Sequence, residues 1–251
     1  MADPFGICRR KIARAKKHIA DLERETGLFF AEPPYSVVID PDPDEPKREV
    51  HKLRFNRSLP DSIADLTVDA VQNLRSALDN VGYGLAVSAG GVNPRHTAFP
   101  FAGSAAEFEN NMKGRCKDIP EEIHPLFRAY QPYRGGNDFL WALNEVSVTD
   151  KHKLLTIALG SLLGNMVGEG ALVRMPINPI WDSLKQEIQL ATCFAGSAVK
   201  YHAEFALFVV FDEIAIVGGE PILKVLHYFV DIAEDILSRI EAEARRLGIV
   251  R

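Results

Sequence analysis

The stretch that decides the fold class is Val68-Asp-Ala-Val-Gln-Asn-Leu-Arg-Ser-Ala-Leu-Asp-Asn-Val-Gly-Tyr-Gly-Leu-Ala-Val-Ser-Ala89. Its apolar side chains recur every three or four residues, and its only charged residues are Asp69, Arg75 and Asp79. A helix that is apolar on most of its sides is usually buried on several faces. Residues 60–89 therefore predict a long helix at the centre of a bundle, and the two glycines that follow predict its end.

Two more long helices are predicted, one before and one after this central helix. Residues 6–29 carry one apolar stripe, while arginines and lysines occupy their other faces. Residues 221–247 carry a second apolar stripe, which Gly248 ends. Shorter helices are expected at two capping-box sequences and before the first strand of the later sheet. These segments are Ser104–Glu107, Asp118–Glu121 and residues 137–153.

β-Strands are expected in two parts of the chain. Residues 35–39 and 50–55 are rich in β-branched and aromatic residues and flank the acidic, proline-rich loop 40–46, which predicts a hairpin. Further strands are indicated by four later segments with short connections, so an antiparallel meander is expected. Those segments are 154–162, 171–177, 188–194 and 199–212.

This order of elements predicts an α+β fold: an N-terminal helical bundle with an inserted β-hairpin, then an antiparallel sheet and a long C-terminal helix. The chain is expected to form a single compact unit over residues 1–251. Within it, sub-parts are expected over 1–153 (mainly helical), 154–215 (antiparallel sheet) and 220–248 (closing helix). Since 47% of the residues are apolar, the chain can bury a sizeable core.

The composition argues against several classes of protein. The net charge of -5 argues against a surface that is basic overall, although it is compatible with a local basic patch. Cys8, Cys116 and Cys193 form no C-x-x-C, so neither a disulfide framework nor a thiolate zinc site is expected. The first residues carry charge where a secretory signal needs an apolar core, and the apolar stretches are too short to span a bilayer. We therefore expect a cytoplasmic protein with no membrane partner.

The first candidate site lies in the central helix. Arg75 and Asp79 are four residues apart, so they share a face and can pair, while Asn73 and Asn80 line a neighbouring face. Polar side chains on so apolar a helix need partners inside the protein. Two interpretations stay open: a buried ion pair that fixes helix packing, and a polar pocket wall in which Arg75 binds an anion or phosphate.

The second candidate site is the segment Asn144–Lys153. Its polar residues include Asn144, Asp150, Lys151 and His152. Histidine titrates near neutral pH, so His152 is the natural acid–base candidate. The alternative is a helix end where Lys151 and His152 complement the helix dipole.

Other chemistry-bearing motifs are missing from the sequence. It contains no P-loop, no G-x-G-x-x-G and no G-x-S-x-G, so no cofactor is expected. The histidines are far apart in sequence, and no metal site is expected. The basic side of residues 6–29 could contact phosphates, although such a face is more often simply solvated.

Two segments resemble a widespread group of uncharacterised bacterial and phage-associated proteins. Gln72-Asn-Leu-Arg-Ser-Ala-Leu-Asp-Asn80 is similar to the group's H-N-L-R-S-A-L-D-H, and Asp150-Lys-His-Lys153 is similar to the end of its N-x-x-D-K-H-[RK]. The resemblance spans residues 10–155. Supporting matches are Ala13–His18, Tyr35, Thr97–Pro100, Gln131–Tyr133 and Leu140–Leu143.

The group's R-S-A-L-D-H also resembles the R-x(4–6)-H signature of HEPN-type ribonucleases, in which Arg and His act on a phosphate inside a helical dimer. The resemblance implies a homodimer that binds RNA or a nucleotide, with Arg75 on the phosphate. Asn80 replaces the histidine and cannot shuttle a proton at neutral pH, so His152 would supply the acid–base group. The expected substrate-binding residues are Asn73, Asp79, Asn80, Asn144, Asp150 and Lys151.

Three functions therefore remain open. The first is a HEPN-like, RNA- or nucleotide-directed protein with attenuated or unproven ribonuclease activity, which requires Arg75 and His152 to lie close together at a cleft. The second is a non-enzymatic interaction or scaffold protein linked to mobile-element or phage-defence biology, in which the pairs Arg75–Asp79 and Asp150–His152 are buried and mutually satisfied. The third is a small-molecule enzyme that uses the same polar residues to line a pocket.

Overall fold

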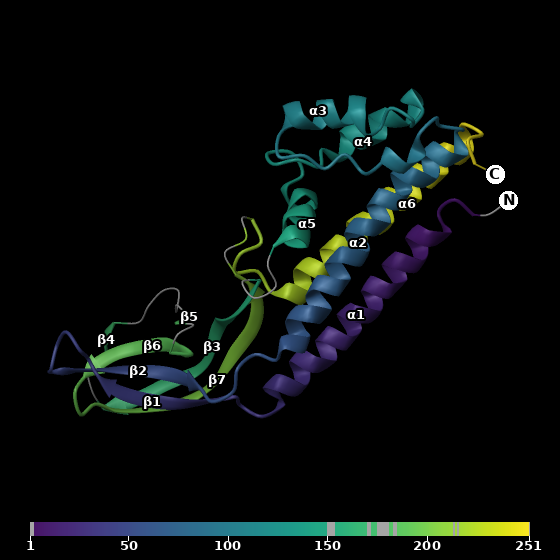
Figure 1. Cartoon of the computed structure of the whole chain (residues 1–251). Coiled ribbons are helices and arrows are strands. Elements are labelled where there is room, and N and C mark those ends of the chain that lie inside the picture. The colour runs from purple at the N-terminus through teal and green to yellow at the C-terminus, as the bar shows by residue number, and fades with distance from the viewer. Residues whose placement is uncertain are drawn as a thin grey trace.

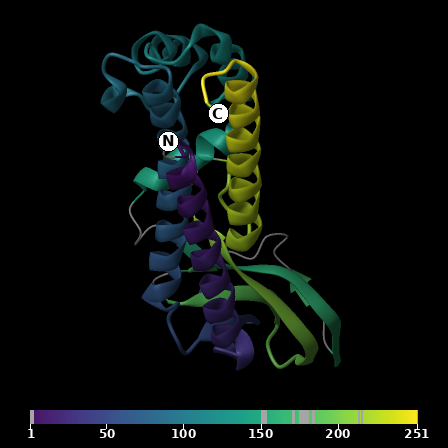
Figure 2. The same ribbon diagram turned by 90° about the vertical axis from the view of Figure 1, so that its right-hand side faces the viewer.

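The computed structural model describes residues 3–149, 154–169, 172–174, 181–182, 185–212, 214 and 216–250. In this part of the chain, three long helices lie side by side and form the body of the molecule (Figure 1 and Figure 2). The first runs opposite to the other two, and the N- and C-termini lie at the same end of the bundle. The helices are α1 (Gly6–Ala31), α2 (Asp61–Ser88) and α6 (Ile222–Arg246).

The central position predicted for α2 is confirmed. Leu74, Leu78 and Leu85 are fully buried, and α2 packs against α1, α6 and the smaller helix α5 (Asp138–Val148). Gly84 allows the segment before α1 to approach closely, because a Cβ there would lie only 2.7 Å from the Pro4 carbonyl oxygen. The small number of charged side chains in the stretch Val68–Ala89 is thus explained by the neighbours that surround α2.

The shorter helices confirm one predicted capping box and correct the other. Ser104 caps α3 (Ala105–Gly114), because its hydroxyl accepts a hydrogen bond from the Glu107 N–H at 3.3 Å. The prediction of a second box at Asp118 is wrong: its carboxylate accepts instead from the Asn93 N–H at 3.0 Å. The remaining short helices are η1 (Pro94–His96), η2 (Glu121–Ile123) and α4 (His124–Tyr130).

The predicted hairpin is confirmed. β1 (Tyr35–Pro41) and β2 (Arg48–Phe55) pair antiparallel, with Tyr35 opposite Phe55 and Pro41 opposite Glu49. Along β2, His51, Leu53 and Phe55 are buried on one face. The hairpin projects with the other strands from the end of the bundle opposite the termini (Figure 1).

The later strands are antiparallel as predicted, but the predicted meander is wrong. β6 (Glu187–Phe194) pairs with β2 of the hairpin, and β4 (Leu172–Arg174) and β5 (Trp181–Asp182) pair with β6. β3 (Leu155–Glu169) pairs along its length with β7 (Ala198–Phe211) in a separate two-stranded ribbon. Short connections alone could not reveal this, because β6 continues the sheet begun by a hairpin far earlier in the chain.

The fold is α+β, with N-terminal helices, a β-hairpin built into an antiparallel sheet, and a long C-terminal helix. One set of buried side chains connects these parts, including Leu22, Leu53, Leu78, Phe211 and Phe229. Within the described ranges, no helix has both the length and the apolar character needed to cross a bilayer.

Candidate functional site

Arg75 lies on the side of α2 that faces α5 and the segment before α3. Its Nε donates a hydrogen bond to the Asn144 Oδ1 of α5 at 2.9 Å, and its guanidinium pairs with the Asp79 carboxylate one turn later. The guanidinium carbon lies 4.4 Å from the centre of the Phe101 ring, within the range of a cation–π contact. The side chain is only 16% exposed. We call these four residues, Arg75, Asp79, Phe101 and Asn144, the Arg75 clamp.

Asp79 extends the clamp to the backbone. Its Oδ1 accepts a hydrogen bond from the Phe99 N–H at 3.1 Å, while its other oxygen faces Arg75. The clamp therefore connects α2 with α5 and with the segment that carries Phe99 and Phe101. A cation held by a carboxylate, an amide oxygen and a ring is well suited to fixing helix packing.

Asn73 and Asn80 do not join the clamp. Each donates its side-chain amide to a carbonyl of its own helix one turn earlier, Asn73 to Asp69 at 2.7 Å and Asn80 to Ser76 at 2.7 Å. They lie on a neighbouring face of α2, as their spacing predicts. The structure thus brings together three predicted site residues, Arg75, Asp79 and Asn144, and leaves these two asparagines apart from them.

The second candidate site is only partly within the described residues. α5 ends at Val148, and the Thr149 hydroxyl donates to the Glu145 carbonyl at 2.9 Å. The predicted site residues Asp150, Lys151 and His152 lie outside the described residues.

Sequence reasoning missed Phe101 as a partner of Arg75. Phe101 is 4% exposed and ends the run Phe99-Pro-Phe101. The available signal was the combination of a buried arginine with an aromatic run elsewhere in the chain. That signal does not tell which aromatic residue approaches the arginine.

A different set of cations lies on α1. Arg10, Arg14 and Lys17 are all exposed, and their spacings of four and three residues place them on one face. In the part of the chain that the structure describes, no carboxylate forms an ion pair with any of them. We call these three residues the basic face.

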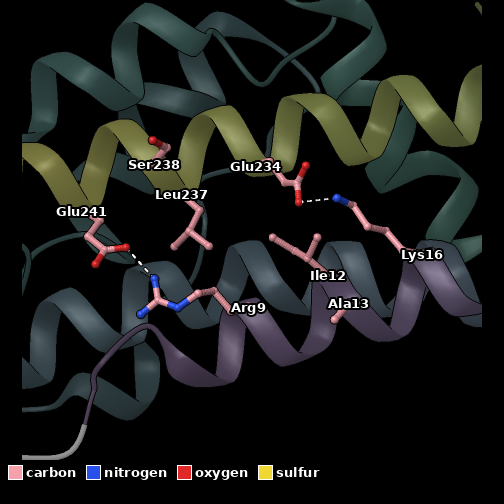
Figure 3. Close-up of a pocket in the computed structure, with 8 residues that line it drawn as sticks. All are labelled: Arg9, Ile12, Ala13, Lys16, Glu234, Leu237, Ser238 and Glu241. Atoms are coloured by element: carbon pink, nitrogen blue, oxygen red, sulfur yellow. Dashed lines mark hydrogen bonds and ion pairs between the residues drawn. The ribbon is translucent and has the colours of Figure 1, made fainter.

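The neighbouring cations of α1 have acidic partners on α6. Arg9 pairs with Glu241 at 2.5 Å and Lys16 pairs with Glu234 at 2.6 Å. Both pairs are drawn in Figure 3. The two pairs border a groove of about 380 Å³ between the helices, where Ile12 of α1 also lies. Because α6 neutralises one side of α1, unpaired positive charge is concentrated on the solvent side.

Comparisons with known protein families, with curated proteins and with solved structures find no match to this chain. Among the described residues, no group of three or more His, Cys, Asp or Glu side chains is placed to hold a metal ion. The cations of the two helices therefore differ: Arg75 of α2 faces inward, whereas the basic face of α1 faces outward.

Proposed function

We propose that this protein binds RNA through the basic face of α1 and does so without using Arg75 to cleave it. The observation that carries this proposal is the exposure of Arg10, Arg14 and Lys17 on one face, with no carboxylate paired to them among the described residues. Such a row of unpaired cations suits the phosphate backbone, which supplies most of the affinity in sequence-independent binding.

The charge distribution along α1 supports a polyanionic ligand. Every charged residue from Gly6 to Ala20 is basic, although the whole chain has a net charge of -5. Positive charge is therefore local, and a local patch can attract a polyanion even when the protein is acidic overall. The choice of RNA among polyanions rests on the resemblance of residues 72–80 to a protein group whose R-S-A-L-D-H segment resembles the HEPN-type signature, although Asn80 replaces the signature's histidine in this chain.

The Arg75 clamp argues against a ribonuclease centre at Arg75. Its guanidinium is engaged by Asp79, Asn144 and Phe101, and Asn80 is bonded to its own helix. A phosphate would have to displace these contacts before Arg75 could hold it. The clamp also favours the second candidate function, a non-enzymatic interaction protein in which the pair Arg75–Asp79 is structural.

The experiment measures the affinity for a labelled single-stranded RNA of mixed sequence by fluorescence anisotropy. The test variant reverses the basic face (Arg10→Glu, Arg14→Glu and Lys17→Glu). The control variant reverses three exposed cations at the end of α3 and beyond, and changes the net charge equally. The control substitutions are Lys113→Glu, Arg115→Glu and Lys117→Glu.

We expect the test variant to bind at least about fiftyfold more weakly, because each phosphate contact contributes a factor of about four at ~0.15 M salt. The wild-type affinity should fall with a log–log salt slope of about -2, as three contacts require. The RNA should remain intact throughout. Equal loss of binding in both variants would show a general charge effect and contradict the proposal, and so would wild-type protein that binds no RNA.

A further inference from the structure

The outer edge of β1 has no strand beside it in the described part of the chain. β1 stands at the end of the strand order β1-β2-β6-β4, so only its inner edge pairs, with β2. An edge strand presents unpaired backbone N–H and C=O groups, which form a template for another strand. The geometry of this edge identifies which backbone groups of Val37 and Ile39 point away from β2 and what partner fits them.

The hydrogen bonds between β1 and β2 determine which residues of β1 direct their backbone N–H and C=O groups away from β2. The Pro34 carbonyl accepts from the Asn56 N–H at 2.9 Å, and the Asp42 N–H donates to the Arg48 carbonyl at 3.1 Å. Backbone groups of even-numbered residues therefore face β2, because the direction alternates along an antiparallel strand. The residues whose N–H and C=O both point away from β2 are Tyr35, Val37 and Ile39.

The same edge leaves an apolar face partly uncovered. Val37 and Ile39 lie opposite Leu53 and His51 of β2, which are fully buried. At the edge, however, Val37 is 40% exposed and Ile39 is 49% exposed. The buried face of the sheet thus continues to β1 without being covered there, and a further strand would extend it.

We propose that a second copy of this chain pairs antiparallel with β1, edge to edge, about a two-fold axis through Val38. In this register Val37 lies opposite Ile39 of the second copy, and Tyr35 lies opposite its Pro41. Residues with outward backbone groups then face one another, and apolar side chains stay on the same face of a sheet that continues through both copies.

The sequence of β1 favours a second copy as the occupant because the strand is complementary to itself. Both copies supply a valine and an isoleucine to the central pairs, and Asp40 falls opposite Ser36 rather than opposite another acid. Proline has no N–H to donate, so Pro34 and Pro41 limit the edge to the residues between them. End-to-end pairing of Tyr35–Pro41 uses this whole length.

The first test measures the mass of the wild type in solution by light scattering over a dilution series. We expect twice the chain mass of 27.8 kDa. The variant Val37→Lys with Ile39→Lys places like charges opposite each other and should be monomeric. The control Val87→Lys with Val92→Lys changes two other exposed valines and should remain a dimer. Circular dichroism verifies that both variants fold.

The second test measures the register directly. Val38 would face Val38 of the second copy as a non-hydrogen-bonded pair, whose short separation suits a disulfide. Val38→Cys should therefore form a covalent dimer on mild oxidation, whereas Ser36→Cys on the same strand should not. The native cysteines are fully buried and do not interfere. A monomeric wild type, or equal cross-linking of the two variants, would overturn the proposal.

Discussion

Two neighbouring helices of the same bundle place arginine side chains in opposite surroundings. On α2, Arg75 is 16% exposed and is held by an acid, an amide and a ring. On α1, Arg10 and Arg14 are exposed and have no ion pair among the described residues. The difference teaches that an arginine in a polar helical motif is not thereby a ligand-binding group. What surrounds the side chain decides what it can bind.

The cause of the difference lies in the apolar pattern of each helix. α2 is apolar on most sides and is enclosed by α1, α5 and α6, so its cation needs internal partners. α1 has a single apolar stripe, which includes Cys8, Ile12 and Ile19, so its remaining faces border α6 or water. The face toward α6 meets the carboxylates of Glu234 and Glu241 on that helix.

The largest effect on stability is expected at the clamp. Arg75→Ala should lower the free energy of unfolding by about 2 kcal/mol, because it leaves Asp79 without its cation and removes the contact with Phe101. Asp79 is 35% exposed, so water can partly solvate it and limit the loss. Urea unfolding measures the change. RNA affinity should stay within about twofold of wild type, because Arg75 does not belong to the basic face. A tenfold change in affinity would correspond to about 1.4 kcal/mol.

Arg75→Lys is the matched control for this prediction. It retains the charge but loses the planar fork and most of the ring contact, so its stability should fall between those of the wild type and Arg75→Ala. If Arg75→Ala unfolds like the wild type and loses RNA binding, Arg75 is a ligand-binding residue and the contrast between the two helices is wrong.

A smaller effect should separate paired from unpaired cations within α1. Arg14→Gln with Lys17→Gln should weaken RNA binding by about fifteenfold, as loss of two phosphate contacts requires. Arg9→Gln with Lys16→Gln removes the same charge from positions already paired with α6, and should change affinity less than about threefold. Anisotropy titrations at one salt concentration make the comparison. Equal losses of RNA affinity in the two variants would contradict the distinction between paired and unpaired cations of α1.

The smallest effect concerns the pH dependence of the seam between α1 and α6. Partial burial raises the pKa of Glu241, but hydrogen bonds from Arg245 and Arg9 outweigh it, so the pKa is below its ordinary value. A lowered pKa stabilises the fold above the unfolded pKa and loses that contribution as pH falls through the folded pKa. At neutral pH, the free energy of unfolding of the wild type should exceed that of Glu241→Gln by about 0.5 kcal/mol.

This advantage of the wild type should disappear as the pH falls from about 5 to about 3. Urea unfolding of both proteins across that range measures it. A difference that persists at the acidic end would show that the carboxylate's charge is not what stabilises the seam.

The sequence predicted the elements better than their pairing. Helical periodicity identified α1, α2 and α6, because the spacing of apolar residues within each segment shows which of its sides will be buried. The partner of β6 could not be read this way, since the pairing with β2 joins segments more than a hundred residues apart. The capping box expected at Asp118 was wrong for a related reason: its carboxylate bonds the distant Asn93 N–H.

The candidate site shows the same limit. The spacing of Arg75 and Asp79 predicted their pairing, which is local to one helix. The spacing of Arg9 and Lys16 did not show that both would meet acids on α6, because those acids come from the other end of the chain. As a result the basic side of α1 could be recognised from sequence, but not which of its cations would remain unpaired.

The most direct test of the central claim compares two adjacent lysines of α1. Lys16 is paired with Glu234, whereas Lys17 belongs to the basic face. The protein is acetylated with and without saturating single-stranded RNA, and the modified lysines are quantified by mass spectrometry. We predict that RNA protects Lys17 strongly while Lys16 and Lys113 change little. Equal protection of all three lysines, or none at saturation, would contradict RNA binding through the basic face.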